Sequence, residues 1–326
     1  MNTELQRRVS NNIPLIIVNP KSASGATENR WARIAADWAQ FYGAFNVDFT
    51  QYRGHAVELA KQAAKDGREF IVACGGDGTI NEVANGIMES GMEAELGVLP
   101  MGTGGDFRRT LGMPSTIRRA SEELKNGVTK RIDVGKVTFV NHQNATEERY
   151  FLNIASVGIG ASIIERVKSG GKMGWLAFDS LRGKASFAYS TLQEVLNLNA
   201  RTIRVRFDDE SVKALQTIVF CVANARYFGG GMKIAPDAVI DDGLFDVVNI
   251  GDIKTAKIVL NVGKLYRGTH YSLDEVKHTT ARRIEVSAFG GEEIHLETDG
   301  ELPGKLPAVF EILPGALKVR VPKPKK

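Results

Sequence analysis

The stretch CGGDGTINEV, residues 74–83, places glycines, an aspartate and a threonine between an apolar run and a sequence with helical periodicity. Glycines let the backbone approach a ligand closely, and the first turn of a helix offers unpaired N–H groups and a partial positive charge. Gly75, Gly76 and Gly78 are therefore expected to form a phosphate-binding loop where a strand meets a helix. Asp77 is unexpected in such a loop, because a bare carboxylate repels a phosphate.

The sequence around this loop alternates apolar runs with amphipathic stretches four times. The apolar runs lie at residues 15–19, 45–50, 70–74 and 96–99, and the helical patterns lie at residues 28–41, 55–67, 79–90 and 115–126. Alternation of this kind is typical of a parallel sheet with helices on its faces. We therefore expect an amino-terminal α/β domain with a doubly wound parallel sheet.

Polar segments follow all four predicted strands. Asn19 comes after the first strand, Thr50 ends the second, and the third leads into the loop at residues 75–79. The fourth strand leads into MGTGGDF, residues 101–107, which again combines glycines with a threonine and an aspartate. The carboxyl ends of parallel strands share one edge of a sheet, where open α/β proteins bind their ligands. The four segments therefore predict one ligand site at that edge.

Helix capping is the alternative explanation for parts of both loops. Thr79 and Glu82 have the spacing of a capping box, and Asp106 is suited to an N-cap position. Capping does not account for the three glycines or for Asp77. The patterns GxxxxGK[ST] and GxGxxG after the first strand are both absent, which argues against a P-loop enzyme and against an ordinary dinucleotide-binding fold.

The pattern changes after about Arg131, where apolar and polar residues begin to alternate. The apolar members of this pattern are Ile203, Val205, Phe207, Ile284, Val286, Leu317, Val319 and Val321. Period two with one apolar face is typical of antiparallel strands that expose one side to water. We therefore expect a second, mainly β domain, with helical segments around residues 173–197 and 255–267.

Length and composition fit an ordinary globular protein. A chain of 326 residues is long enough for two cores, and a net charge of +4 is too small to indicate a nucleic-acid-binding protein. Cys74 and Cys221 lie in apolar runs and are expected to be reduced core residues. No apolar stretch approaches the roughly 20 residues that span a bilayer, so we expect a cytoplasmic protein.

Two stretches leave peripheral contact with the inner membrane surface open. The aromatic and partly basic segment at residues 173–192 could line a lipid entrance or lie on a membrane, and it could equally be a packed core helix. The basic tail at residues 318–326 could favour an anionic surface, or it could be a solvated terminus.

The stretches GGDGTINEVANGI (75–87) and GTGGDF (102–107) together resemble the catalytic domain of the diacylglycerol-kinase and sphingosine-kinase superfamily, especially its soluble bacterial members. The GGDG loop alone is less specific, because NAD kinases and phosphofructokinases carry a similar loop. Three further stretches strengthen the resemblance, namely FLNIASVGIGA (151–161), residues 224–247 and TDGE (298–301). The similarity covers almost the whole chain in the family's order.

The resemblance implies an amino-terminal α/β domain that binds ATP, a carboxy-terminal antiparallel β-sandwich that binds lipid, and a reaction in the cleft between them. We expect the first domain to span residues 12–133, completed by residues 306–322, and the second to span residues 134–305. The implied activity is ATP- and Mg²⁺-dependent transfer of the γ-phosphate to a hydroxyl group of diacylglycerol or a related lipid.

The same resemblance implies roles for individual residues. Glu301 is the expected general base for the lipid hydroxyl, and Asp77 is expected to organise Mg²⁺ and the γ-phosphate. Asp242, with the backbone carbonyl groups of Val239 and Leu244, would hold a second, structural Mg²⁺. The residues expected to contact ATP are Asn19, Thr50, Gly75, Gly76, Asp77, Gly78, Thr79, Asn81, Gly102 and Thr103.

Two positions depart from the family pattern, because Gly105 stands where Asn is usual and Ala23 stands where Gly is common. Two other functions stay open at this point: a soluble NAD-kinase-like enzyme, and a non-catalytic lipid or nucleotide sensor with the same fold. The sequence does not specify the lipid. It also leaves the oligomeric state open, a homodimer included.

Overall fold

The structure is a computed structural model that describes residues 13–102, 104–158 and 200–324. It divides into two compact units. The first consists of residues 1–134 and 314–326, and the second of residues 135–313. The long strands β5 (Val128–Asn141) and β17 (Glu301–Val321) each contribute to both units.

The first unit is built on a parallel sheet with the strand order β2-β1-β3-β4-β17. Its strands, besides the end of β17, are β1 (Leu15–Val18), β2 (Asn46–Phe49), β3 (Phe70–Gly75) and β4 (Glu95–Pro100). Its helices are the 3₁₀ helix η1 (Ser22–Gly25), α2 (Ala26–Tyr42), α3 (His55–Lys65), α4 (Asp77–Ser90), α5 (Asp106–Thr110) and α6 (Ile117–Asn126). The predicted strands and helices of this region are confirmed.

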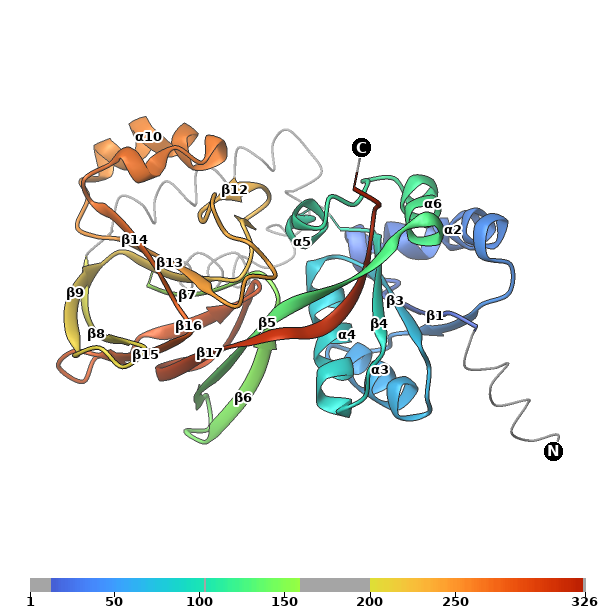
Figure 1. Cartoon of the computed structure of the whole chain (residues 1–326), viewed down its shortest axis with the longest axis horizontal. Helices are drawn as coiled ribbons and strands as arrows, with labels where there is room; N and C mark the ends of the chain where they lie inside the picture. The colour runs from blue at the N-terminus through green and yellow to red at the C-terminus, as the bar shows by residue number, and fades with distance from the viewer. Residues whose placement is uncertain (1–12, 103, 159–199, 325–326) are drawn as a thin grey trace. The chain divides into compact units, whose positions relative to one another are not determined.

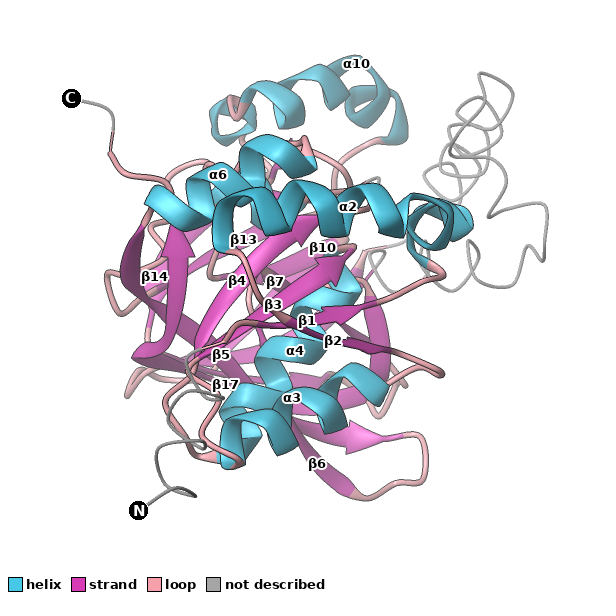
Figure 2. Cartoon of the chain, turned by 90° about the vertical axis from the view of Figure 1, so that its right-hand side faces the viewer, coloured by secondary structure: helices cyan, strands magenta, loops and turns pink. Residues whose placement is uncertain are grey.

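Helices cover both faces of this sheet. In Figure 2, α2 and α6 lie on one side of strands β1 to β4, and α3 and α4 lie on the other. All of β1 and β3 is buried, as expected for central strands that are covered on both faces. The predicted doubly wound parallel sheet is therefore confirmed.

One strand prediction needs a correction. The alternation of Leu317, Val319 and Val321 was expected to mark an antiparallel strand, and these three residues are indeed buried. However, this end of β17 pairs in parallel with β4, with Lys318 opposite Glu95. Strand β17 also pairs with β5, and side chains alternate along a strand in parallel and antiparallel pairs alike, so the period alone does not give the direction.

The second unit is an antiparallel β structure (Figure 1). Its strands, besides parts of β5 and β17, are β6 (Thr146–Phe151), β7 (Ile154–Gly158), β8 (Arg201–Phe207), β9 (Lys213–Thr217), β10 (Val219–Ala223), β11 (Tyr227–Phe228), β12 (Met232–Lys233), β13 (Phe245–Ile250), β14 (Val276–Ala281), β15 (Arg283–Ala288) and β16 (His295–Thr298). Its helical elements are α10 (Thr255–Arg267) and η2 (His270–Ser272). One row of strands follows the order β14-β13-β10-β7-β16-β17, and a second follows β9-β8-β15-β17.

The alternating pattern read from the sequence gives the core of this unit. Ile203 and Val205 are fully buried, whereas Arg204 and Arg206 between and beside them are exposed. The inward side chains join a cluster that includes Phe151, a large residue with no exposed surface. The predicted helix at residues 255–267 is confirmed as α10, and the one predicted around residues 173–197 lies outside the described residues.

Both cysteines are core residues, as predicted. Cys74 lies on β3 and Cys221 on β10, both are fully buried, and neither forms a disulfide. Burial raises the pKa of both thiols, since an apolar environment disfavours the thiolate. Among the described residues, no helix combines the length and the apolar character that crossing a bilayer requires.

Helices α3 and α4 pack very closely at Gly86 of α4. A Cβ atom built at this position would overlap the carbonyl oxygen of Val57 and would lie 2.7 Å from the Cβ atom of Ala60. Gly78, in the first turn of the same helix, is exposed, and a Cβ atom there would meet nothing within 4 Å. Packing therefore requires glycine at position 86, but it does not explain the glycine at position 78.

This contrast predicts opposite effects of two alanine substitutions in one helix. We expect Gly86→Ala to lower the free energy of unfolding by about 1–2 kcal/mol, because overpacking outweighs the gain in helix propensity. Gly78→Ala should leave it unchanged or raise it by up to about 1 kcal/mol. Urea unfolding of both variants checks the pair, and equal stability of the two would contradict the packing interpretation.

Candidate active site

In the first unit, the loop after β1 is fastened to the loop after β3. The side-chain amide of Asn19 donates a hydrogen bond to Thr79 Oγ1 over 3.0 Å. The backbone N–H of Asn19 donates to the carbonyl oxygen of Cys74, the last apolar residue of the FIVAC run, over 3.0 Å. The polar segments at the carboxyl ends of these two strands are thus brought together, as the strand pattern predicted.

The carboxylate of Asp77 binds the backbone of the second glycine loop. Its Oδ2 accepts hydrogen bonds from the N–H groups of Gly105 (2.7 Å) and Asp106 (3.3 Å), and its Oδ1 accepts one from Phe107 (3.2 Å). Gly105 is the N-cap residue of α5, so the aspartate of the first loop satisfies the N–H groups at the start of α5. The two loops form one structure that Asp77 holds together.

Close contact between the loops explains two further glycines. A Cβ atom at Gly102 would lie 2.5 Å from the Cα atom of Gly76, and one at Gly104 would lie 2.7 Å from Asp77 Oδ2. Real Cβ atoms do not approach other heavy atoms this closely, and the Gly102 contact is with backbone that cannot rotate away. The glycines of the second loop are therefore required for packing against the first.

The capping explanation for these loops is wrong. Helix α4 begins at Asp77, and its N-cap residue is Gly76, which has no side chain to cap it. Thr79 lies within the first turn and accepts the hydrogen bond from Asn19, while Glu82 Oε1 accepts one from the N–H of Gly54 over 3.0 Å. The T-x-x-E spacing is present, but both side chains bind other parts of the unit.

Asp106 does not cap α5 either. It is the first residue of that helix, and its carboxylate lies 2.9 Å from the guanidinium group of Arg109. Arg109 also donates a hydrogen bond to the carbonyl oxygen of Gly104. Both caps were misread because the N-cap is the residue just before the first one with helical dihedrals, and a glycine holds that position before Asp77 and before Asp106.

The two departures from the family pattern occur in left-handed backbone. Gly105 has φ +64° and Ala23 has φ +51°. Asparagine and glycine are the residues that adopt this region most readily, so Gly105 can replace an asparagine without changing the path of the loop. Ala23 is less suited to this conformation than the glycine common in the family, because its Cβ atom is crowded there.

The amino end of α4 is the part of the loop that packing leaves available. Gly78 is exposed and has open space on its Cβ side, and the N-cap residue of the helix, Gly76, has no side chain to cap it. The first N–H groups of a helix have no partner within the helix and carry a partial positive charge. This arrangement is chemically suited to bind an anion such as a phosphate group.

The remaining residues expected to contact ATP differ in position. The half-buried Thr50 follows β2, and its N–H donates to the carbonyl oxygen of Val18. Asn81 is buried within α4, where its Oδ1 accepts a hydrogen bond from Asn85 over 3.1 Å. Thr103 lies outside the described residues. Contact of these residues with ATP stays a prediction.

In the second unit, the expected base Glu301 is held in an ion pair. It begins β17, and its Oε2 lies 2.7 Å from the Nη2 atom of Arg149 on β6. Both side chains keep only about a fifth of their surface exposed, at 21% and 22%. Arg149 was missed in the sequence, because the strand TEERYF shows no motif that separates this cation from surface charges.

The turn that carries Glu301 is fixed by two carboxylates. Asp299 accepts hydrogen bonds from three consecutive N–H groups of β7 and the turn before it, at Leu152, Asn153 and Ile154, over 2.7, 2.9 and 3.0 Å. The buried Glu297 accepts from the N–H of Gly300 over 2.6 Å. Asp299 thus holds this turn against the start of β7, and Glu297 holds the N–H of Gly300 within the turn.

The family motifs of this unit therefore meet in space. The carbonyl oxygen of Asn153 accepts hydrogen bonds from the N–H groups of Asn224 and Ala225, over 2.8 and 3.1 Å. The stretches at 151–158, 224–228 and 298–301 lie together although many residues separate them in the chain. The sequence contained the signal for Asp299 in its TDGE motif, but only the fold shows that this aspartate binds backbone.

The predicted second metal site lies in the turn before β13. Asp242 Oδ1 accepts a hydrogen bond from the N–H of Leu244 over 3.0 Å, and Val239 is exposed. Burial, followed by repulsion from Asp242 and Asp237, raises the pKa of the nearby Asp246 carboxyl to about 6. A divalent cation would relieve this repulsion. No group of three or more His, Cys, Asp or Glu side chains with metal-site geometry occurs among the described residues, and a metal ion held by Asp242 and the two backbone carbonyl groups stays a prediction.

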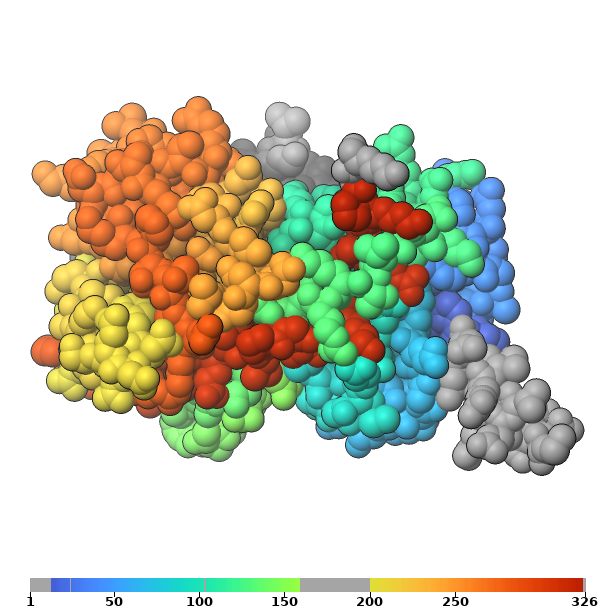
Figure 3. Space-filling model, in the orientation of Figure 1, coloured from blue at the N-terminus to red at the C-terminus, as the bar shows by residue number. Residues whose placement is uncertain are grey.

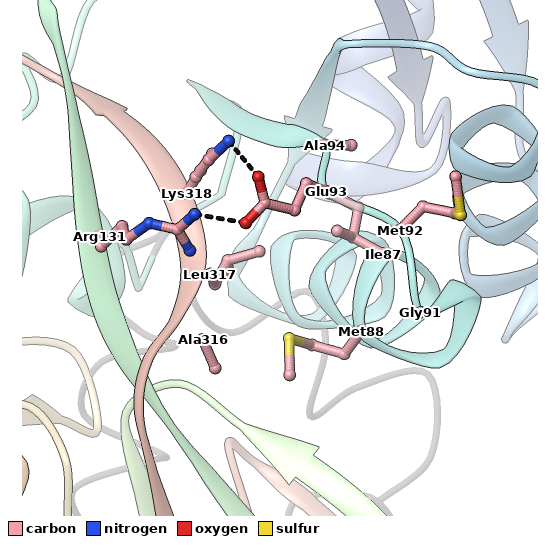
Figure 4. Close-up of a pocket in the computed structure, with 10 residues that line it drawn as sticks. All are labelled: Ile87, Met88, Gly91, Met92, Glu93, Ala94, Arg131, Ala316, Leu317 and Lys318. Atoms are coloured by element: carbon pink, nitrogen blue, oxygen red, sulfur yellow. Dashed lines mark hydrogen bonds and ion pairs between the residues drawn. The ribbon is translucent and has the colours of Figure 1, made fainter.

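A pocket of about 200 Å³ in the first unit lies away from the glycine loops. Figure 4 shows Glu93 held by Arg131 and Lys318, with Met88 and Met92 on the other side. This pocket adjoins the amino end of β4, whereas the second glycine loop follows the carboxyl end of that strand. It is therefore not the candidate phosphate site.

Two family models match the chain. A model of the diacylglycerol kinase catalytic domain matches residues 14–137. A model described as the YegS C-terminal NAD kinase beta sandwich-like domain matches residues 154–321. Together they cover strands and helices of both units.

Curated relatives and solved structures agree with these models. The diacylglycerol kinase of Bacillus subtilis (strain 168) is 30% identical over 95% of this chain and 96% of its own length. A diacylglycerol kinase of Staphylococcus epidermidis is 30% identical over 84% of this chain and 81% of its own. A solved Bacillus anthracis structure, described as a candidate diacylglycerol kinase, covers 96% of this chain and 98% of its own, with 25% identity and a TM-score of 0.75.

The contacts of Asp77 predict a structural effect of its substitution. In Asp77→Asn, an amide group replaces one of the oxygens that accept the N–H groups of the second loop. We expect the free energy of unfolding to fall by about 2 kcal/mol, since a hydrogen bond to a charged group contributes roughly 1.5–3 kcal/mol.

Denaturant unfolding measures this loss, and Asp48→Asn is the matched control. Asp48 is exposed on β2, so its substitution should leave stability within about 0.5 kcal/mol of the original. If both variants unfold at the same denaturant concentration, Asp77 does not hold the second loop.

Proposed function

Because this chain belongs to the diacylglycerol kinase family of lipid kinases, we propose that it transfers the γ-phosphoryl group of ATP to a hydroxyl group of diacylglycerol or a closely related lipid. We assign nucleotide binding to the first unit and lipid binding to the second. The Bacillus subtilis relative is named a diacylglycerol kinase, and the similarity extends over nearly the full length of both chains. Its name supports this choice of substrate.

The observation that carries the proposal is the amino end of α4. Packing explains Gly86, Gly102 and Gly104, but it does not explain Gly78. A ligand that approaches the backbone closely gives a reason for glycine at an exposed helix position without strain. The uncapped helix end and the exposed glycine together support a phosphate of ATP as that ligand.

Glu301 is the group that we assign as general base. It accepts the proton of the lipid hydroxyl at a carboxylate oxygen while the hydroxyl oxygen forms a bond to the γ-phosphorus, and the bond from that phosphorus to the β–γ bridging oxygen breaks to release ADP. Arg149 positions this carboxylate through their ion pair. Asp299 and Glu297 act through the backbone by fixing the turn on which Glu301 lies.

Mg²⁺, when bound with ATP, would neutralise charge on the phosphates. The carboxylate of Asp77 is an oxygen ligand of the kind that Mg²⁺ prefers, although its two oxygens already accept hydrogen bonds from the second loop. We therefore assign Asp77 an indirect role, in which it acts on Mg²⁺ by holding the second loop, rather than direct coordination. The oxygens of Asp242, Val239 and Leu244 fit a second, structural Mg²⁺ in their chemistry.

The assignment of Glu301 predicts a selective loss of turnover. We expect Glu301→Gln to lower kcat by roughly 10²–10⁴-fold, the usual contribution of a general base, and to leave ATP binding unchanged. Glu285→Gln is the matched control, because Glu285 is also paired with arginine in the same unit but lies on the exposed face of β15. Turnover of Glu301→Gln at the level of this control would contradict the assignment.

Product analysis tests the reaction itself. The protein is incubated with ATP, Mg²⁺ and a total lipid extract, and in a parallel sample with NAD, and the products are identified by mass spectrometry. We expect a phosphorylated lipid, with phosphatidic acid as the product from diacylglycerol. Formation of NADP, or ATP binding without any product, would replace the proposal by an NAD kinase or by a non-catalytic sensor.

A further inference from the structure

Helix α10 (Thr255–Arg267) exposes an apolar surface instead of burying it. None of its residues is buried, and Leu260 keeps 84% of its surface exposed. Val259, Val262 and Tyr266 are also large exposed side chains. The helix lies along one edge of the second unit (Figure 1), and its orange atoms form part of the outer surface in Figure 3.

The exposed apolar residues share one face of the helix. At 3.6 residues per turn, positions 259, 260, 262 and 266 fall within about half of its circumference. The opposite face carries Ile258 and Leu265, which are only half-buried, and Leu265 packs on the apolar cluster of β10 and β13. An ordinary surface helix turns polar residues to water, so this helix is apolar on its outer as well as its inner face.

Cations flank the apolar face, and the helix contains no acidic residue. Lys254 and Arg267 at its two ends are exposed, and within the described part of the chain neither forms an ion pair. Lys264 lies in the last turn, and Lys233 lies beside Gly268, where the helix ends. The remaining basic residue of the helix, Lys257, is neutralised by Glu275 over 2.7 Å.

We propose that the exposed face of α10 docks on an anionic lipid bilayer, with Leu260 and its apolar neighbours inserted between headgroups and the flanking cations against lipid phosphates. A large apolar face with basic flanks is the composition of helices that lie in a membrane interface. Each cation near an anionic leaflet adds about 1 kcal/mol of attraction. The inference rests on the proposed function, since a diacylglycerol substrate resides in a bilayer.

Helix α10 alone offers less surface than a second copy of the chain would need. A helix of 13 residues is roughly 20 Å long and about 10 Å wide, which gives a footprint of about 200 Å². Each partner in a stable protein complex buries about 800 Å². A bilayer needs no such area on one element, because insertion of a few side chains and a few cations already gives measurable binding.

Vesicle partition of the full chain tests the proposal. Vesicles of equal parts phosphatidylglycerol and phosphatidylcholine are sedimented with the unsubstituted protein, with Leu260→Asn, and with the matched control Val212→Asn, another exposed apolar residue of the same unit. We expect Leu260→Asn to lower the partition coefficient about tenfold, because a buried leucine side chain contributes roughly 1.5–3 kcal/mol. Val212→Asn should bind as the unsubstituted protein does.

The electrostatic part has its own readout. Lys254→Gln combined with Arg267→Gln should lower the partition coefficient roughly twentyfold, and high salt or pure phosphatidylcholine vesicles should remove the difference. Because the chain has three tryptophans of its own, the emission of Leu260→Trp is compared with that of the unsubstituted protein, and the difference should shift to shorter wavelength when vesicles are added. Equal binding of Leu260→Asn and Val212→Asn, or no emission shift in bound Leu260→Trp, would overturn the proposal.

Two further measurements separate the competing explanations. Sedimentation velocity of the free protein shows whether Leu260→Asn dissociates a dimer, and such a change with unaltered vesicle binding would assign the face to a second copy and overturn the proposal. Phosphorylation of diacylglycerol in detergent micelles tests the proposed function without a bilayer. Micelle activity with no vesicle binding would overturn the docking proposal alone, and vesicle binding through α10 with no kinase activity would overturn the function alone.

Discussion

The first unit depends on one interaction, the binding of three backbone N–H groups by the carboxylate of Asp77. This carboxylate comes from the loop after β3, and the N–H groups belong to the loop after β4, so it joins two segments about 30 residues apart. The join requires glycine at positions 102 and 104, where a side chain would overlap the first loop. The amino end of α4, where the exposed Gly78 lies, is the position at which we propose that an anion binds.

The second unit repeats this device with other residues. Asp299 binds three consecutive N–H groups of the segment 152–154, as Asp77 binds those of 105–107. A charged acceptor gives stronger hydrogen bonds than a carbonyl group, so three of them hold each bound segment firmly in place. In both units an aspartate of a family motif thus holds backbone, and in the first unit this is Asp77, which the resemblance had marked as a catalytic candidate. Loss of activity after its substitution would not by itself identify it as catalytic.

The exposed apolar surface of α10 differs from these aspartate contacts, because no packing constraint within the described residues explains it. Evolution removes such surfaces from most soluble domains, since they favour association. In a lipid kinase the same surface can serve access to substrate, because it holds the protein where the lipid is. The apolar face, the flanking cations and the absence of acidic residues on the helix all agree with this purpose.

The sequence by itself determined the strands and most helices of the amino-terminal α/β region, strands β8 and β15, helix α10 and the common edge of the polar segments, because apolar periodicity reports burial directly. It could not give the direction of pairing at Val319, the true caps of α4 and α5, or the partner of Glu301. Those features depend on hydrogen bonds between residues far apart in the chain, and local spacing such as T-x-x-E does not show whether a nearer or a distant donor is available. Only the tertiary structure decided which donor each side chain binds, since it sets which backbone groups each carboxylate can reach.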